Sequence, residues 1–258
     1  MDLYSAMFTR KSTRKFLPEA LGADELVGIK EFIAGVAPLV PSSNFSHRIV
    51  GPDAVKGLAI PDAPHFILIS GPKQPLRNTC AGFLFQHLDL YLFSQGLAAR
   101  WLGMVKPREK DPAFIIGIAF GKPAEPAVRT LAEFDRKPLS EIASGYDPRL
   151  EAARLAPSGV NGQPWYFIVD DDGEIHTYCK EQLGGLLGMA YKLTDLDVGI
   201  ALCHLKVASE HEGKPFNFRT DLTMVPPAPK GFRYLGTVTN AVANASRLDN
   251  GEVGVKVD

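Results

Sequence analysis

A short basic segment near the start of the chain has the composition of an anion-binding turn. Arg10, Ser12 and Arg14 alternate with Lys11 and Thr13. Guanidinium groups bind phosphate in a bidentate manner, and a hydroxyl group and backbone N–H groups can complete the pocket. A solvated basic turn would have the same composition, so this segment alone leaves both interpretations open.

A second segment, far along the chain, combines small, amide and aromatic residues. It reads Ala-Pro-Ser-Gly-Val-Asn-Gly-Gln-Pro-Trp-Tyr-Phe over residues 156–167. Ser158, Asn161 and Gln163 offer both donors and acceptors, and the glycines allow close backbone approach to a flat polar ring. The loop therefore suits a heteroaromatic ligand. A plain stop of one helix and start of one strand would also use Asn and Gly for turn geometry.

Together the two segments resemble the nitroreductase family. Members of that family carry an Arg-x-Ser-x-Arg stretch near the N-terminus and a Pro-Ser, Asn and Gln-Pro-Trp stretch in a loop after a helix. The resemblance implies an FMN-dependent oxidoreductase in which the flavin accepts a hydride at N5 from NADH or NADPH. It also implies a small electron-poor acceptor, such as a nitro compound or a quinone.

The resemblance assigns cofactor contacts to both parts of the chain. Arg10, Ser12 and Arg136 would face the flavin phosphate and ribityl chain, and Lys11 or Arg14 would reach the ring or phosphate. Gln95–Gly103 resembles the family's helix end and glycine loop, so the backbone of Leu102 and Gly103 would approach the N5 edge. Because the flavin carries the chemistry, no catalytic side chain is expected. The full expected set is Arg10, Lys11, Ser12, Arg14, Leu102, Gly103, Arg136, Lys137, Pro157, Ser158, Gly159, Asn161 and Gln163.

The arrangement departs from the family pattern in the distance between the two motifs. In ordinary members they lie a few tens of residues apart, and each flavin takes one motif from each subunit of an obligate dimer. Here more than a hundred residues separate them. Residues 41–48 look like a degraded loop without Gln-Pro-Trp, and the later part of the chain lacks an arginine turn. We therefore predict a fused dimer with halves at 1–145 and 146–258, one retained flavin site, and a monomer or weak homodimer in solution.

The pattern of apolar residues predicts the same order of elements twice, as a diverged duplication would give. The expected fold is α+β and nitroreductase-like, with two pseudo-repeated halves, each with a central long helix and an antiparallel-rich mixed sheet. The expected helices are 3–8, 24–35 with Asp24 as N-cap, 81–99, 149–156 and 197–209, and the expected strands are 65–70, 114–120, 165–169, 175–178 and 234–238.

Composition excludes several other classes. The 258 residues carry a net charge of -1, which provides no field for nucleic acid, and no apolar run is long enough to span a bilayer. Cys80, Cys179 and Cys203 lack disulfide or zinc spacing, and we expect a cytoplasmic protein. No metal is expected, because the histidines lack ligand spacing and the acidic turn at 170–173 lacks the glutamate of a calcium loop. That turn is expected to close a hairpin.

Two alternatives to the enzyme remain at this level. One is a non-catalytic flavin-binding or nucleotide-sensing protein, which would also hold FMN. The other is an interaction module with a vestigial pocket, which would hold none; the joint retention of the two motifs disfavours it.

Overall fold

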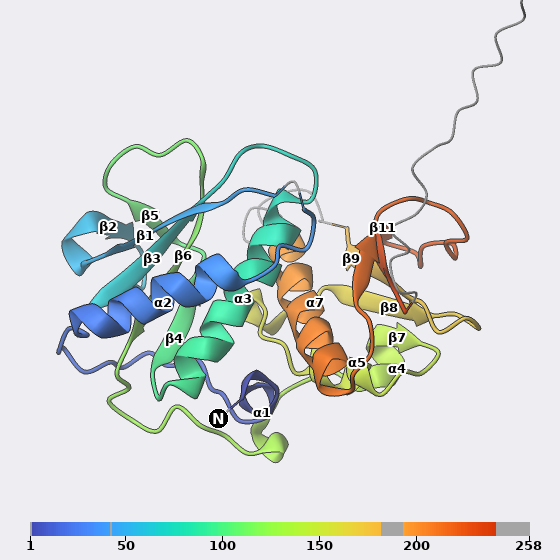
Figure 1. The fold of residues 1–258 in the computed structure, drawn as a ribbon, viewed down its shortest axis with the longest axis horizontal. Helices are drawn as coiled ribbons and strands as arrows, with labels where there is room; N and C mark the ends of the chain where they lie inside the picture. Colours follow the sequence, from blue (N-terminus) through green and yellow to red (C-terminus); the bar gives the residue numbers. More distant parts are fainter. Residues whose placement is uncertain (1, 42, 182–192, 241–258) are drawn as a thin grey trace, which may run out of the picture.

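The computed structural model describes residues 2–41, 43–181 and 193–240. The fold is α+β: two long helices lie side by side at the centre, with one antiparallel-rich sheet beyond each of them (Figure 1). This agrees with the fold class predicted from the sequence.

The first sheet and its helices use residues up to 121. Its strands lie in the order β1-β3-β6-β4, and every neighbouring pair is antiparallel. A separate two-stranded sheet, β2-β5, lies beside it. The elements are α1 (Leu3–Met7), α2 (Ala23–Gly35), β1 (Ser46–Val50), η1 (Pro52–Ala54), β2 (Val55–Gly57), β3 (His65–Ser70), α3 (Arg77–Ser94), β4 (Ala98–Leu102), β5 (Val105–Pro107) and β6 (Phe114–Gly121).

The second sheet repeats this order along the chain. Its strands lie in the order β10-β11-β9-β8-β7, so β8, β9, β10 and β11 occupy the places of β1, β3, β4 and β6. The additional strand β7 pairs with β8 in parallel. The elements are η2 (Leu131–Glu133), α4 (Leu139–Ile142), β7 (Ala143–Ser144), α5 (Arg149–Arg154), η3 (Gly159–Asn161), β8 (Trp165–Val169), β9 (Ile175–Lys180), α7 (Thr194–His211), β10 (Asn217–Arg219) and β11 (Phe232–Thr239).

The central helices α3 and α7 touch through two glycines that face each other's backbone. A Cβ on Gly82 would lie 2.0 Å from the carbonyl oxygen of Leu196, and a Cβ on Gly199 would lie 1.9 Å from that of Thr79. Each glycine thus meets the residue three positions before the other glycine. Such reciprocal contact is the geometry of a two-fold interface, here within one chain. Both helices are apolar on several faces because each is buried between its own sheet and the other helix.

The first long helix is displaced from its predicted range of 81–99. It begins at Arg77 and ends at Ser94, because Gly96 adopts a positive φ of 78° and Leu97 N–H donates to Leu92 O in a Schellman turn. The following residues form β4, which the sequence did not predict. Helix α2 is also capped by Gly22 rather than Asp24, since Glu25 reaches back to the Gly22 N–H.

Two further expectations can be checked against the described residues. None of their helices combines the length and the hydropathy that a membrane span needs. All three cysteines are free and buried.

Candidate functional site

The arginine turn after α1 sends its first arginine into the interior. Arg10 is 2% exposed, and its Nε lies 3.0 Å from Oδ2 of Asp89 on α3. Backbone bonds fix the turn from outside, since Lys11 N–H donates to Ala127 O and Arg129 N–H donates to Thr9 O. Burial raises the pKa of the Asp89 carboxyl, and the positive charge of Arg10 opposes that shift. The turn therefore fixes one guanidinium beside Asp89 on the central helix α3.

Two more arginines join Arg10 to form what we call the arginine cluster, Arg10, Arg129 and Arg136. Arg129 Nε donates to Arg10 O at 3.1 Å, and its guanidinium lies 3.4 Å from the ring centre of Phe134. Burial, followed by the charges of Arg136 and Arg10, lowers the pKa of Arg129 to about 10. Burial and the charge of Arg10 lower the pKa of Arg136 to about 10 as well. Cations that depress one another in this way would be stabilised by a bound anion.

The cluster is joined to residues 157–163, which we call the Ser158 loop. Arg136 Nη1 donates to Oδ1 of Asn161 at 2.8 Å, and Lys137 N–H donates to Oε1 of Gln163 at 2.9 Å. Ser158 Oγ accepts from Gln163 N–H at 3.0 Å and closes the loop on itself. Arg136 thus bonds to the second segment that the sequence singled out, and it lies close enough to Arg10 of the first for the two charges to interact.

The backbone of the Ser158 loop is held in an uncommon conformation. Val160, Asn161 and Gln163 have φ values of 47°, 56° and 46°. Left-handed backbone costs a non-glycine residue about 1–3 kcal/mol and persists only where surrounding contacts enforce it. The bonds from Arg136 and Lys137 are such contacts, so the loop is shaped by groups outside itself.

A buried polar network lies behind the cluster, between α3 and α7. Gln86 Nε2 donates to Asp89 Oδ2 at 3.0 Å, and Gln86 Oε1 accepts from Trp101 Nε1 at 3.2 Å. His204 Nε2 lies 3.3 Å from Gln86 Nε2, and its Nδ1 lies 2.9 Å from Ala152 O. Burial lowers the pKa of His204 to about 3, so its ring is neutral, with Nδ1–H as donor and Nε2 as acceptor. The network links the cluster to the strand that carries Leu102.

The end of strand β4 meets the start of helix α7. Leu102 is buried, and a Cβ on Gly103 would lie 3.8 Å from Cδ1 of Leu193, the N-cap residue of α7. One turn further along α7, Oδ1 of Asp197 accepts the Gly159 N–H at 3.0 Å. The first turns of α7 therefore contact both Gly103 and the Ser158 loop.

The structure brings together only part of the predicted set. Hydrogen bonds or ion pairs to the arginine cluster, the Ser158 loop, α3 or α7 connect seven of its members: Arg10, Arg136, Lys137, Ser158, Gly159, Asn161 and Gln163. The side chains of Lys11, Ser12 and Arg14 are exposed, and within the described ranges no hydrogen bond or ion pair joins them to the cluster or the loop. Arg14 instead lies near Arg100. Burial lowers the pKa of the Arg100 guanidinium, and the charge of Arg14 lowers it further. The binding roles of all these residues stay predictions.

Sequence reasoning missed four polar residues of this region: Gln86, Asp89, Arg129 and Asp197. Three of them had a usable signal, because they are polar positions inside helices that are otherwise apolar. A buried polar group needs a partner, so Gln86, Asp89 and Asp197 could have been marked as parts of a network. Arg129 lies in a turn of mixed composition and had no comparable signal.

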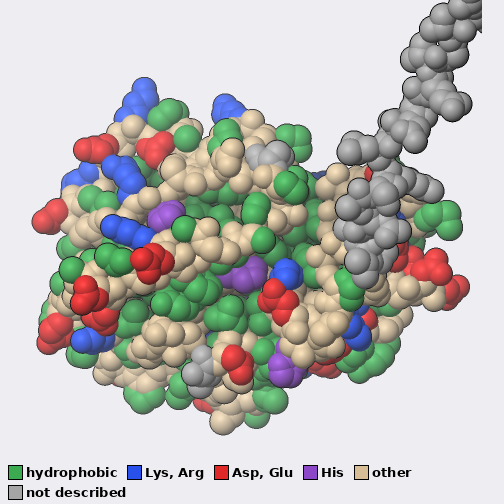
Figure 2. All heavy atoms as spheres, in the orientation of Figure 1, with side chains coloured by type: hydrophobic (Ala, Val, Ile, Leu, Met, Phe, Trp, Pro, Cys, Tyr) green, Lys and Arg blue, Asp and Glu red, His purple; other side chains and the backbone are tan. Residues whose placement is uncertain are grey.

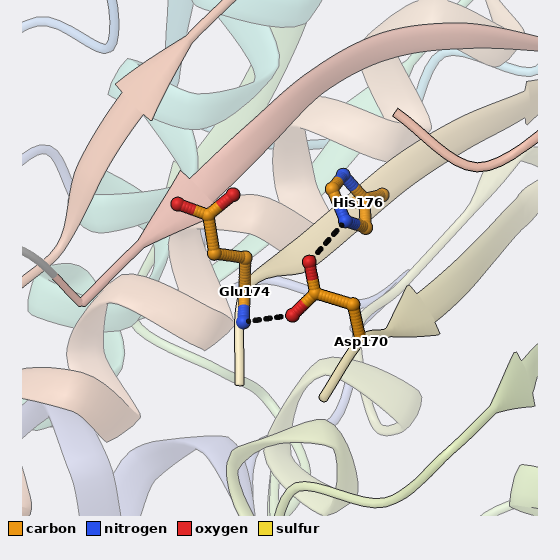
Figure 3. Close-up of side chains that lie close together, drawn as sticks. All are labelled: Asp170, Glu174 and His176. Atoms are coloured by element: carbon orange, nitrogen blue, oxygen red, sulfur yellow. Dashed lines mark hydrogen bonds and ion pairs between the residues drawn. The ribbon is translucent and has the colours of Figure 1, made fainter. Parts of the chain in front are cut away.

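The acidic turn before β9 contains one group that could hold a metal ion. Asp170, Glu174 and His176 place one ligand atom each within 4.8 Å of one another (Figure 3). Protein partners already occupy them: Asp170 Oδ1 accepts the Glu174 N–H, Asp170 Oδ2 lies 2.9 Å from His176 Nε2, and Glu174 pairs with Arg219. The turn closes the antiparallel pair β8–β9, as predicted.

A cleft of about 290 Å³ opens at the first turns of α3 and α7, and none of the predicted site residues lines it. Both of its arginines already have partners, since Arg77 donates to Gly71 O and Arg233 pairs with Asp195. We therefore place the candidate site at the arginine cluster and the Ser158 loop.

Comparison with known proteins places this geometry in a family. Residues 2–209 match the family described as "Putative TM nitroreductase". A Thermotoga maritima structure described as a putative nitroreductase has a TM-score of 0.67 at 19% identity, covering 93% of this chain and 94% of that one, which shows a shared fold.

Two shorter structures cover about half of this chain. A Clostridium difficile nitroreductase family protein covers 57% of this chain and 99% of its own length, at 18% identity and a TM-score of 0.45. A Desulfovibrio desulfuricans protein described as a putative nitroreductase in complex with FMN covers 55% of this chain and 94% of its own length, at 18% identity and a TM-score of 0.41. No protein of curated function matches the sequence. Because the family match spans most of the chain, the chain belongs to the nitroreductase family described above.

Proposed function

We propose that this protein is an FMN-dependent oxidoreductase that passes electrons from NADH or NADPH to nitro, quinone or related electron-poor small molecules. The observation that carries the proposal is the bond between Arg136 and Asn161. It joins a cluster of three mutually repelling arginines to a loop rich in hydrogen-bonding groups. An anionic tail beside a flat polar ring is the ligand shape that such a pair of features fits.

The residues present fit the phosphate of FMN. Arg10 Nη2 is buried and has no hydrogen-bond partner among the described residues, although Arg10 Nε is paired with Asp89. An orphaned buried donor is costly, and a phosphate oxygen would satisfy it. Arg129 and Arg136 would supply the remaining positive charge.

Each part of the site then has a separate task. When bound, the flavin supplies the redox chemistry by accepting a hydride and passing on electrons. The arginine cluster would hold the phosphate, and the side chains of Ser158, Asn161 and Gln163 fix the loop that would cover the ring. The backbone at Leu102 and Gly103 would approach the N5 edge. Lys11, Ser12 and Arg14 are exposed and would be free to meet the ribityl chain or a nicotinamide dinucleotide.

We further propose one flavin site per chain in a protein that corresponds to a fused dimer, with halves at 1–145 and 146–258 that arose by duplication. The shared strand order and the reciprocal contacts of Gly82 and Gly199 support this proposal. Because the interface between the central helices is internal, a monomer or weak homodimer suffices. A tight dimer in gel filtration with flavin at the intermolecular contact would contradict this proposal.

Surface charge and the state of the cysteines bear on the partners and on the cellular compartment of the protein. On the face seen in Figure 2, basic and acidic side chains are interspersed, without the broad basic surface that nucleic acid requires. Three free buried cysteines fit a reducing compartment, and we propose the cytoplasm.

The visible absorption spectrum of the purified protein tests the proposal. We expect flavin bands that bleach when NADH or NADPH is added under nitrogen and return with a quinone or nitroaromatic compound. Bands that do not bleach would favour the alternative, a non-catalytic flavin-binding or nucleotide-sensing protein. A colourless protein that also fails to bind added FMN would contradict both.

A further inference from the structure

Asp197 is a buried carboxyl group that the proposed reaction does not use. It lies in the first turns of α7 and is 8% exposed. In the described part of the chain, the donor that reaches it is the Gly159 N–H, at 3.0 Å from Oδ1. Oδ2 faces the same residue, since a Cβ on Gly159 would lie 3.6 Å from it. Both carboxylate oxygens therefore lie against the Ser158 loop.

The environment of Asp197 disfavours its ionised form. Burial raises the pKa of Asp197 to about 7, and the Gly159 N–H only partly opposes the shift. Charged groups on the neighbouring elements are engaged elsewhere: Arg136 donates to Asn161, Arg77 of α3 donates to Gly71 O, and Asp195 pairs with Arg233. The loop from 157 to 163 has no ionisable side chain.

We propose that Asp197 is a positioning residue that holds the Ser158 loop for FMN and takes up a proton when FMN binds. The inference rests on the proposed function. The carboxyl accepts the N–H of Gly159, which directly precedes the left-handed positions at 160, 161 and 163. It therefore stabilises the part of the loop whose backbone conformation is least favourable. A ring packed on the loop would shield the carboxyl, which is 8% exposed, further from water, and the phosphate would add negative charge. Both effects favour the protonated form.

The linkage has a definite sign. If FMN binding raises the pKa of Asp197 above 7, the complex holds a proton that the free protein has lost, and affinity falls as pH rises past 7. A rise of one pKa unit weakens binding roughly sixfold between pH 6.5 and 8.5. This range lies above the second ionisation of a phosphate, at about 6, so the phosphate itself contributes little.

The experiment measures FMN dissociation constants by flavin fluorescence quenching from pH 6.5 to 8.5. The wild type should show a roughly sixfold weakening, whereas Asp197→Asn, whose amide oxygen still accepts from Gly159, should bind with little pH dependence. Asp195→Asn, two residues away on the same helix, is the matched control and should keep the wild-type slope. An unchanged slope in Asp197→Asn overturns the proposal, while failure of the wild type to bind FMN at all overturns the proposed function as well.

A second measurement tests positioning without cofactor. Amide hydrogen exchange of residues 159–163 should speed up in Asp197→Ala, because the Gly159 N–H loses its acceptor, and should stay unchanged in Asp195→Asn. Equal exchange in Asp197→Ala and wild type, with both folded by circular dichroism, would also overturn the proposal.

Discussion

The two central helices match in packing and differ in chemistry. Helix α3 carries Cys80 two residues before its crossing glycine, and α7 carries Asp197 at the corresponding place. Burial raises the pKa of both side chains, so each is held in its neutral form more strongly than in water. The carboxyl group of Asp197, unlike the thiol of Cys80, can accept a strong hydrogen bond from a loop N–H whether it is ionised or protonated. It can also exchange a proton near neutral pH.

The loops beside these helices also differ in the polar contacts that hold them. The Ser158 loop is bonded to Arg136, Lys137 and Asp197, whereas residues 43–46 have no comparable arginine among the described hydrogen bonds. Packing between the helices needs only small residues at the crossing point, and two halves can share it while one of them loses its polar groups. The two central helices therefore share their packing, whereas the polar contacts of the loops beside them are not shared.

The packing side of this comparison should give the largest effect. Gly82→Ala and Gly199→Ala each place a methyl group about 2 Å from a backbone carbonyl. The helices would have to separate, at a cost of about 3 kcal/mol or more. Thermal unfolding should shift down by roughly 6–12 °C in each variant. Gly35→Ala, which has nothing within 4 Å, is the control. A large loss in only one of the two variants would show that the crossing is not equivalent from both sides.

The chemical side is tested by an arginine at each loop. Arg136→Met removes one cation of the cluster and the anchor of Asn161, so FMN should bind about 100-fold more weakly, as expected for charged hydrogen bonds worth about 1.5–3 kcal/mol. Arg48→Met, in the strand after the loop of the first half, removes a guanidinium paired with Glu109 and should change the dissociation constant little. Comparable losses in both variants would place flavin chemistry in both halves.

Much of the architecture could be predicted from local patterns. The run from His65 to Ser70 and the run from Phe114 onward are apolar and bounded by proline or glycine, and both are strands. The end of α3 was missed because Leu97, Ala98 and Ala99 continue a helical pattern, and the stop depends on the positive φ of Gly96. Strand β4 then forms because β6 offers an unpaired edge, which is a tertiary effect.

The site was predictable where its residues form a motif and not where it depends on side-chain direction. Asn161 and Gln163 were expected, and they bond to Arg136 and Lys137. The sequence could not show that Arg10 points inward while Arg14 stays exposed, because that depends on the buried Asp89. Asp197 was read only as part of an apolar helix, since nothing local indicates that Gly159 will reach it.

The raised pKa of Asp197, which has Cys80 as its counterpart on α3, also predicts that the free energy of unfolding depends on pH. The folded Asp197 keeps its proton up to about pH 7, whereas an unfolded chain loses it near pH 4. Unfolding therefore releases a proton between these values, and stability falls as pH rises through them. Asp197→Asn should gain about 2 kcal/mol in the free energy of unfolding at pH 8 relative to pH 5, compared with wild type. Urea unfolding at the two pH values measures this gain, and a variant whose difference from wild type is the same at both would contradict it.

The smallest expected effect concerns two histidines at corresponding positions of α3 and α7. His87 and His204 each follow the crossing glycine by five residues, and burial lowers the pKa of both, that of His204 to about 3. An unfolded histidine binds a proton near pH 6.5, whereas the folded rings bind one only at lower pH, so stability falls as pH drops below that value. From pH 7 to 5.5 the His204 share of this loss is about 1 kcal/mol. His204→Asn should remove that share from urea unfolding curves, and His87→Asn should remove a separate one. If His204→Asn shows the same fall with pH as wild type, the ring is protonated in the folded protein and its proposed role as acceptor for Gln86 is wrong.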